Sequence, residues 1–411
     1  MRPSSSPFSR ALFEAMLDVE RALTTANAVM GLVPTSAAAR INAVCEVERY
    51  DVDAIWQQAE SSGNPVVPLV EAISAEAGPW VHFGATSQDV LDTAMMLTVK
   101  RAVTAMPLAG VLDACAGLVR EHRSTVMAAR TLGQQAVPTT FGLLAATWLN
   151  GLVGRLDIVG VLQFGGAAGT LAASDRRGLA VADHLGRLLE LEVPALPWHT
   201  DRAPIRAVAN ELASTVVACG KIALDVTLLA QTEVGEVSEG TGGSSSAMPH
   251  KQNPIGSVLI GAAARRVPGL LGPFYAPHEL HRATGAWHAE WEPLRELVEL
   301  THVTLERTER LLGNLQIHPE RMLANLDPRV MAESVASRLA ALLGRTEAHR
   351  IVVRASGGGD FRASLVADPD VRGVLSVEEL DHALDPTSWL GSADELIERA
   401  LAAYEEGRRH G

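Results

Sequence analysis

The feature that most constrains the fold is a heptad-spaced run of apolar and small residues in the middle of the chain. Steps of four and three residues alternate along it, and the residues are Leu212, Val216, Cys219, Ala223, Val226 and Ala230. Such spacing keeps one face of a helix against its neighbour at a shallow crossing angle. The seam therefore predicts a long helix in a bundle, and it says nothing about chemistry.

Composition supports the same fold class for the whole chain. Of 411 residues, 47% are hydrophobic but only 4% are aromatic, and strand-type alternation is rare. This balance favours long, closely packed helices over sheets, so we expect an all-α protein. Composition shifts near Val90 and Pro328 divide it into a helical domain 1–93, a long-helix bundle domain 94–330 and a short helical domain 331–411. A last amphipathic helix is predicted from Ser392 to about Glu406.

Two uncharged stretches, Gln134 to Gly154 and Ile158 to Ser174, resemble membrane spans at first sight. Polar residues interrupt the first and glycines the second, so both are predicted to be interior helices of the bundle. The glycine-rich run Phe164 to Thr170 lacks the Gly-Lys-Ser/Thr of a phosphate loop, which favours close helix–helix approach.

Charge and cysteine content narrow the class further. A formal net charge of −13 argues against nucleic-acid binding, and an anionic substrate would need local Arg, Lys and His groups. The three cysteines are scattered without metal spacing, which fits a reducing compartment. The N-terminal segment has no apolar h-region, so a cytoplasmic location is expected.

The segment most informative about chemistry is GGSSSAMPHKQNP, Gly242 to Pro254. Its glycines and serines predict a mobile loop, followed by a helix with Asn253 as N-cap and Pro254 as first residue, running to about Arg265. Lys251 and the helix N-terminus both favour negative charge. The arrangement suits stabilisation of a carbanion delocalised onto a carboxylate, with a serine alkoxide as base.

This segment closely resembles the signature loop of the fumarase/aspartase superfamily. The resemblance implies that Ser245 is the catalytic base and that Lys251 and Asn253 bind the substrate carboxylate. It also implies substrate contacts for Ser246 and Met248.

Two further segments resemble shared regions of that superfamily. HFGATSQD, His82 to Asp89, is similar to the first region, which implies substrate binding by His82, Thr86 and Ser87. Neutral hydrogen-bonding side chains suit carboxylate oxygens, although T-S-Q-D alone is also a good helix N-cap sequence.

RTLGQQAVPTTFG, Arg130 to Gly142, is similar to the second region. Here the resemblance implies substrate binding by three residues: Arg130, Thr131 and Gln134. Where many members carry an acid histidine and its glutamate partner, this chain has Leu132 and Val258. The matched loss of both groups indicates changed chemistry.

A general acid is needed for a poor leaving group such as an amine, but a carboxylate leaves as a weak base with a conjugate-acid pKa of about 4. Within the superfamily, the resemblance then points to lactonisation of 3-carboxy-cis,cis-muconate in aromatic catabolism, the β-ketoadipate pathway. PWHTDR, Pro197 to Arg202, resembles the cycloisomerase branch, as do Gly285 to Trp291 and Leu384 to Leu401. Leu132 departs from the tryptophan expected in bacterial members of that branch.

Within these segments, several roles remain open. His199 is a candidate proton donor, a substrate ligand or a ring packed on Trp198. Arg202 is expected to face a substrate carboxylate, because its guanidinium offers a bidentate fork. His288 and Glu290 fit either a pocket wall or an interdomain contact. The histidines are too dispersed to indicate a metal site.

The resemblance implies a homotetramer with a shared central bundle and active sites built from three subunits, acting on a small anionic polycarboxylate without a cofactor. Another lyase with an easily expelled anion, such as nitrosuccinate lyase, is the alternative activity. Adenylosuccinate or argininosuccinate cleavage fits less well without the histidine acid. A non-catalytic helical scaffold is the alternative of a different class, and the intact Ser245, Lys251 and Asn253 argue against it. No nucleic-acid or membrane partner is expected.

Overall fold

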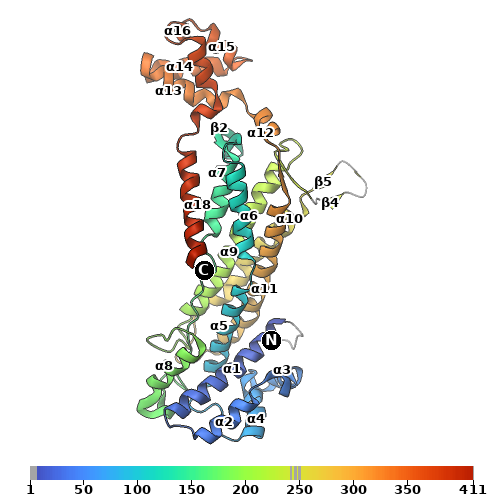
Figure 1. Ribbon diagram of the computed structural model, residues 1–411, viewed down its shortest axis with the longest axis vertical. Helices are drawn as coiled ribbons and strands as arrows, with labels where there is room; N and C mark the ends of the chain where they lie inside the picture. Colours follow the sequence, from blue (N-terminus) through green and yellow to red (C-terminus); the bar gives the residue numbers. More distant parts are fainter. Residues whose placement is uncertain (1–6, 241–242, 245–247, 249–250, 411) are drawn as a thin grey trace. The chain divides into compact units, whose positions relative to one another are not determined.

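A computed structural model describes residues 7–240, 243–244, 248 and 251–410 of the chain. The fold is mostly helical, as predicted, with a few short strands (Figure 1). Two compact units are distinguished by their internal contacts. Unit 1 comprises Met1–Met106, Arg155–Val217 and Ala263–Thr304, and unit 2 comprises Pro107–Gly154, Ala218–Ala262 and Leu305–Gly411. The three-domain division expected from composition stays a prediction.

Unit 1 is built around the N-terminal helix α1 (Pro7–Val29), which packs against α5 (Ser87–Thr104), α2 (Thr35–Val44) and α8 (Gly178–Leu189). Every residue of α5 from Gln88 to Val99 is buried, polar side chains included. A helix that is buried on all sides must pair its polar groups internally, so α5 already marks a polar site inside the unit. The remaining elements are α3 (Val52–Ser62), α4 (Val66–Ala77) and the 3₁₀ turns η1 (Val47–Arg49), η2 (Ala172–Arg177) and η3 (Gly272–Tyr275).

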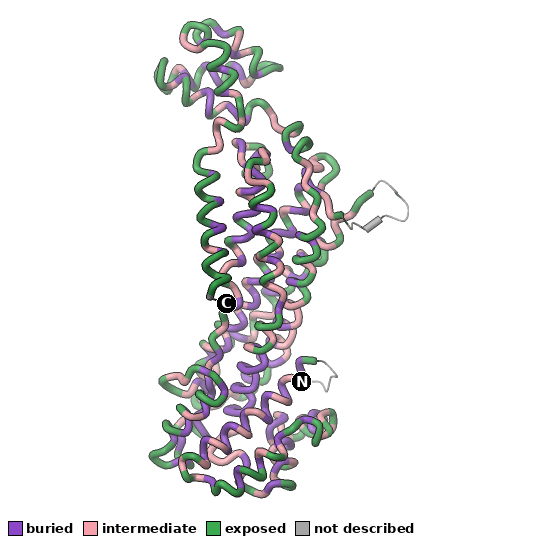
Figure 2. Tube along the Cα trace, viewed as in Figure 1, coloured by how far each residue is buried: buried purple, intermediate pink, exposed green. Residues whose placement is uncertain are grey.

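Unit 2 contains α6 (Leu108–Glu121), which packs on α7 (Phe141–Leu152), and the C-terminal helix α18 (Ala393–His410). The latter has one buried and one exposed face (Figure 2), which confirms the predicted amphipathic helix. Three antiparallel strand pairs are found among the described residues of the unit. They are β1 (Val126–Thr131) with β2 (Gln134–Thr140), β3 (Val237–Glu239) with β6 (Leu315–Ile317), and β4 (Gly243–Ser244) with β5 (Gln252–Asn253).

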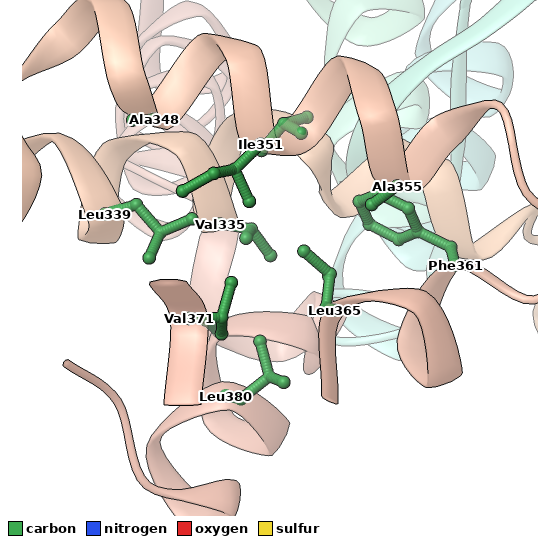
Figure 3. Packing of buried hydrophobic residues seen from close by; sticks show 11 residues of the cluster. Val335, Leu339, Ala348, Ile351, Ala355, Phe361, Leu365, Val371 and Leu380 are labelled. Atoms are coloured by element: carbon green, nitrogen blue, oxygen red, sulfur yellow. The ribbon is translucent and has the colours of Figure 1, made fainter. Parts of the chain in front are cut away.

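A local core holds together the helices between residues 332 and 384. One hydrophobic cluster joins these helices (Figure 3). It includes three fully buried residues: Leu339 on α13 (Ala332–Leu343), Ile351 on α14 (Arg345–Ser356) and Leu365 on α15 (Phe361–Ala367). Such a self-contained apolar cluster lets a short segment fold on its own contacts. The neighbouring elements are α12 (Pro319–Asn325), η4 (Pro328–Met331), α16 (Pro369–Arg372), α17 (Val377–Leu384) and η5 (Pro386–Trp389).

Three helices, α9 (Ala203–Leu229), α10 (Ile255–Leu271) and α11 (Ala286–Gly313), contribute residues to both units. The heptad seam lies on α9, and all its members up to Val226 are buried within this chain. The predicted long helix is therefore confirmed. Because the seam is already covered by the chain itself, it does not by itself call for a second subunit.

Two sequence expectations were wrong in detail. Only α7 is helical in the first uncharged stretch, since β2 precedes it, and Ile158 to Ser174 is loop and 3₁₀ turn rather than a bundle helix. The helix after the signature segment begins at Ile255, after Asn253 has ended β5, and it continues past the predicted Arg265 to Leu271 with Pro268 inside. Hydrophobicity alone does not distinguish a buried loop from a buried helix.

Two helical stretches, Ser87–Glu121 and Ala203–Leu229, are apolar and long enough to cross a membrane by length and composition only. Core helices of soluble proteins pass the same test, and half of the second window is buried inside the chain. This observation is therefore weak support for a membrane protein.

Candidate active site

The buried Asp89 carboxylate, in the first turn of α5, accepts five hydrogen bonds. Its Oδ1 accepts from Gln163 Nε2 at 2.9 Å, from Gly165 N at 3.0 Å and from His199 Nε2 at 2.7 Å. Its Oδ2 accepts from Thr86 N at 3.0 Å and Gly166 N at 2.9 Å. A carboxylate has about four lone-pair sites. Asp89 is thus saturated by the protein and organises the site rather than meeting a substrate.

The glycine-rich run Phe164 to Thr170 wraps around this carboxylate. A Cβ atom on Gly165 would lie 2.7 Å from Pro197 Cβ and 2.9 Å from His199 Cε1, so only glycine lets the loop approach. Gly166 has a φ of +68°, which glycine adopts without strain. The run therefore cradles a protein anion, and the predicted helix–helix approach is not its reason.

His199 is fixed from both its ring and its backbone. Its Nε2 is bonded to Asp89, its carbonyl accepts from Gln88 Nε2 at 2.8 Å, and the whole residue is 5% exposed. Since a carboxylate only accepts, the Nε2 atom carries the hydrogen. Among the described residues, no side chain or backbone group bonds its Nδ1. The His199 ring is therefore held in place by Asp89, and its role as proton donor, substrate ligand or packed ring stays a prediction.

Arg202 lies in a buried ion cluster on the same segment. Its Nη1 donates to Asp92 Oδ2 at 2.6 Å and its Nη2 to Glu290 Oε2 at 2.7 Å. Trp287 Nε1 also donates to Asp92, at 2.9 Å, and the guanidinium carbon lies 4.8 Å from the Trp198 ring centroid. Two protein carboxylates therefore bind the Arg202 guanidinium, which was expected to bind a substrate carboxylate. This geometry argues against direct substrate contact and favours a positioning role for Arg202.

The same cluster explains Glu290, whose role the sequence left open. Burial raises the pKa of its carboxyl, although Arg202 acts in the opposite direction. Glu290 is thus a core partner of Arg202. His288 is exposed instead, with Nε2 3.0 Å from the Gly63 carbonyl oxygen.

The first shared region forms the turn into α5. Thr86 is the N-cap and Ser87 the first helical residue, both half-buried, so the N-cap interpretation of T-S-Q-D is correct. His82 precedes them with its Nδ1 2.6 Å from Glu20 Oε1. Arg282 donates to Gln88 Oε1 at 3.0 Å beside this turn. Glu20 and Arg282 were missed, because no local motif marks either residue.

The second shared region forms the β1–β2 hairpin of unit 2. Thr131 pairs with Gln134 at its end, and both are exposed. Leu132 in the turn has a φ of +52° and is fully exposed. Arg130 donates to the two oxygens of the buried Glu236 at 2.9 and 2.5 Å. It therefore anchors the hairpin, with its fork engaged by the protein.

The signature segment is described only in part, and Ser245 and Ser246 lie outside the described residues. Lys251 and Met248 are exposed, and Asn253 is half-buried in β5. The start of α10 is already capped. Glu239 accepts from Gly256 N at 2.9 Å and from Ser257 N at 2.8 Å. The predicted role of this helix N-terminus as a substrate anion site is therefore wrong for the conformation seen, since a protein carboxylate holds it.

The predicted site residues fall into two groups. Unit 1 holds His82, Thr86, Ser87, His199 and Arg202, joined through Asp89 and its neighbours. Unit 2 holds the remaining described ones, Arg130, Thr131, Gln134, Met248, Lys251 and Asn253. Within the described ranges, no three His, Cys, Asp or Glu side chains are grouped to hold a metal ion.

Comparison with known proteins places this site in a family context. A family model described as "Lyase" matches residues 4–269, and one described as "Adenylosuccinate lyase C-terminus" matches residues 328–400. A 3-carboxy-cis,cis-muconate cycloisomerase of Pseudomonas aeruginosa is 40% identical over 432 residues, covering 98% of this chain and 94% of that protein. A nitrosuccinate lyase of Streptomyces davaonensis is 41% identical over 440 residues, covering 97% and 92%.

Solved structures are similar to this chain in fold as well. The crystal structure of 3-carboxy-cis,cis-muconate lactonizing enzyme from Pseudomonas putida matches with a TM-score of 0.87 at 38% identity. The match covers 96% of this chain and 95% of that one. The likeness therefore extends over nearly the whole chain.

We expect Asp89→Asn to destabilise the protein, because the new amide must point N–H groups at donors on one side of the site. Leaving buried donors unsatisfied costs about 1–3 kcal/mol each. Urea unfolding should show a loss of at least about 2 kcal/mol. Asp53→Asn, at an exposed position of α3, is the matched control and should change stability by less than about 0.5 kcal/mol. Equal stabilities of the two variants would contradict the organising role of Asp89.

Proposed function

Because this chain belongs to the fumarase/aspartase superfamily of lyases, we propose that it interconverts 3-carboxy-cis,cis-muconate and carboxymuconolactone in aromatic catabolism. In the lactonising direction, an internal carboxylate oxygen adds to a carbon of the diene and a proton adds to the carbon α to another carboxylate. One C–O and one C–H bond form at the expense of a π bond, so substrate and product are isomers. No cofactor is implied.

The observation that carries this proposal is the match to cycloisomerases along nearly the whole chain, in sequence and in fold. The proposal is also supported by the apolar residues at the two positions where many members carry the acid histidine and its glutamate partner. Leu132 and Val258 are both exposed and cannot donate a proton. The reverse reaction expels a carboxylate, which needs no acid because it is stable unprotonated.

The roles of the site residues follow from this reaction. Ser245 moves the proton at the α carbon. Lys251 and Asn253, with Thr86 and Ser87, hold the resulting aci-carboxylate, because preorganised donors stabilise charge as it develops. His199 presents Nδ1 to the substrate from the ring held by Asp89.

Nitrosuccinate lyase is the second candidate, since a protein of that name is 41% identical to this chain. Nitrite, like a carboxylate, leaves without protonation, so the same apolar pair fits both reactions. Only the substrate separates the two candidates.

A substrate panel tests the proposal. Purified protein is offered 3-carboxymuconate, nitrosuccinate, adenylosuccinate and argininosuccinate at several pH values, and loss of the conjugated-diene absorbance is followed for the first. We expect turnover of 3-carboxymuconate and none of the two amine-releasing substrates, for which a missing general acid costs about 10²–10⁴-fold. Turnover of nitrosuccinate alone would support the second candidate. Efficient release of an amine would overturn the leaving-group argument, and retained lactonisation in His199→Gln would support it.

Replacement of the proposed base gives a sharper test. Ser245→Ala should lower turnover by about 10²–10⁴-fold, since an essential proton-transfer group is lost. The circular dichroism spectrum should stay unchanged, because the removed hydroxyl is small. Ser246→Ala is the matched control on the same loop. Unchanged turnover in the first variant, or an equal loss in the second, refutes the assignment to Ser245.

The chain is proposed to form a homotetramer in which each site draws residues from several subunits. An exposed apolar face of α9 supports this: Leu224 and Leu228 are each 50% exposed, one helical turn apart. Val258 and Leu259 on α10 are 51% and 43% exposed. Soluble proteins rarely leave such faces uncovered. In this tetramer, the exposed residues Thr131 and Gln134 contribute to the active site of a neighbouring subunit. The enzyme is also proposed to be cytoplasmic.

Subunit exchange tests the composite site. Mixing inactive Ser245→Ala chains with inactive Thr86→Ala/Ser87→Ala chains should restore partial activity, because some assembled sites contain only intact elements. In sedimentation, Leu224→Glu/Leu228→Glu should dissociate the assembly. Leu396→Glu, at a 47% exposed position of α18, is the control and should not. An active monomer, or no recovery despite confirmed exchange, defeats the proposal.

A further inference from the structure

Helix α1 holds the turn that leads into α5 with two side chains, Glu20 and Asn27. They are seven residues apart, so they lie on one face of the helix about two turns from each other. Asn27 Nδ2 donates to the Phe83 carbonyl at 3.0 Å, and Glu20 binds the preceding residue, His82. Neither residue lies in a sequence motif.

Glu20 binds His82 through both of its carboxylate oxygens. Oε2 accepts from the His82 backbone N at 3.1 Å, and Oε1 lies 2.6 Å from the ring Nδ1. The bidentate contact ties the ring orientation to a backbone that has a φ of +62°. A non-glycine residue is strained in this region, so it persists only where its surroundings hold it.

The burial of Glu20 makes the charge of His82 matter. The Glu20 side chain is 0% exposed, and both of its hydrogen bonds within the described residues come from His82. A buried carboxylate without a counter-charge is costly, and an imidazolium is the cation in contact with it. With Nδ1 engaged, Nε2 is the remaining ring donor, and the side chain keeps 18% of its surface exposed.

We propose that Glu20 is a positioning residue that holds His82 as an imidazolium, leaving its Nε2–H to bind a carboxylate group of the substrate. The inference rests on the proposed function for the identity of that ligand as a polycarboxylate. It adds a fixed positive charge next to Thr86 and Ser87, whose hydroxyls are neutral. In a chain of net charge −13, such a local cation is what an anionic substrate requires.

The electrostatics of the turn agree with this geometry. Burial by itself lowers the pKa of His82, but Glu20 on α1 and, more weakly, Asp89 on α5 raise it above its ordinary value. The imidazolium is therefore present below the ordinary value and is lost only as pH rises through the raised pKa. Anion binding should weaken across that same rise in pH.

The first experiment uses the unmodified protein. Histidine labelled with ¹³C at Cε1 and ¹⁵N in the ring is followed by NMR between pH 5 and 9, with His82→Gln to assign the signal. The titration midpoint of the His82 ring should lie above its ordinary value. A midpoint at or below the ordinary value of about 6.5 overturns the proposal whether or not any variant folds.

Variants then separate charge from packing. The probe is tricarballylate, a saturated tricarboxylate that cannot be lactonised, with binding measured by calorimetry. Glu20→Gln should weaken binding about tenfold at pH 7.5, and most of the loss should disappear at pH 5.5, where the ring is protonated without Glu20. Glu20→Asp, which keeps the charge, should lose less than about threefold. Glu14→Gln, at a position of the same helix whose side chain is 44% exposed, should bind like the parent protein.

Each outcome decides one claim. A pH-independent loss in Glu20→Gln, or an equal loss in Glu20→Asp, shows a purely structural role and defeats the inference. If 3-carboxymuconate is not turned over while the His82 ring stays doubly protonated and tricarballylate binding depends on Glu20, the proposed reaction fails and this inference stands.

Discussion

The fold of unit 1 depends on one buried carboxylate, that of Asp89. Its five bonds join the start of α5, the glycine loop, Gln163 and His199, which are up to 110 residues apart in the sequence. Removing a charge from water is costly unless it is fully hydrogen-bonded, so these segments can fold only together. The same requirement that stabilises the fold places the His199 ring and the Thr86 turn within one network.

Charge balance explains why this region is both buried and polar. Asp92 and Glu290 share Arg202, and Glu20 is matched by His82. A buried ion cluster contributes less to stability than apolar packing of the same volume, so its value lies in fixing a single arrangement of side chains. Here that arrangement fixes the backbone segments that carry His199 and His82.

Patterns that repeat along the chain could be predicted, whereas contacts between distant residues could not. The seam on α9 has a periodicity, and Thr86 has a local N-cap signature, so the structure confirms both. The partners of Arg202 lie 88 and 110 residues away, so nothing local in the sequence shows that its guanidinium binds protein carboxylates rather than a substrate. Ile158 to Ser174 was misjudged because this buried loop is held by hydrogen bonds from Gln163, Gly165 and Gly166 to Asp89, which hydrophobicity does not reveal. The role of Glu20 could not be predicted, because a single acidic residue in a helix belongs to no motif.

The two histidine environments suggest how the missing general acid is tolerated. Leu132 and Val258 remove proton donation from the hairpin side, which a carboxylate or nitrite leaving group does not need. The requirement that remains is to bind a highly charged substrate and stabilise a carbanion, and for this a fixed cation is better than a proton donor. His82, clasped by Glu20, supplies a positive charge, while His199 is bound to a carboxylate already saturated by other donors. This chain thus has a histidine bound to a buried carboxylate at the turn into α5. Its role there is to bind the substrate, not to protonate the leaving group.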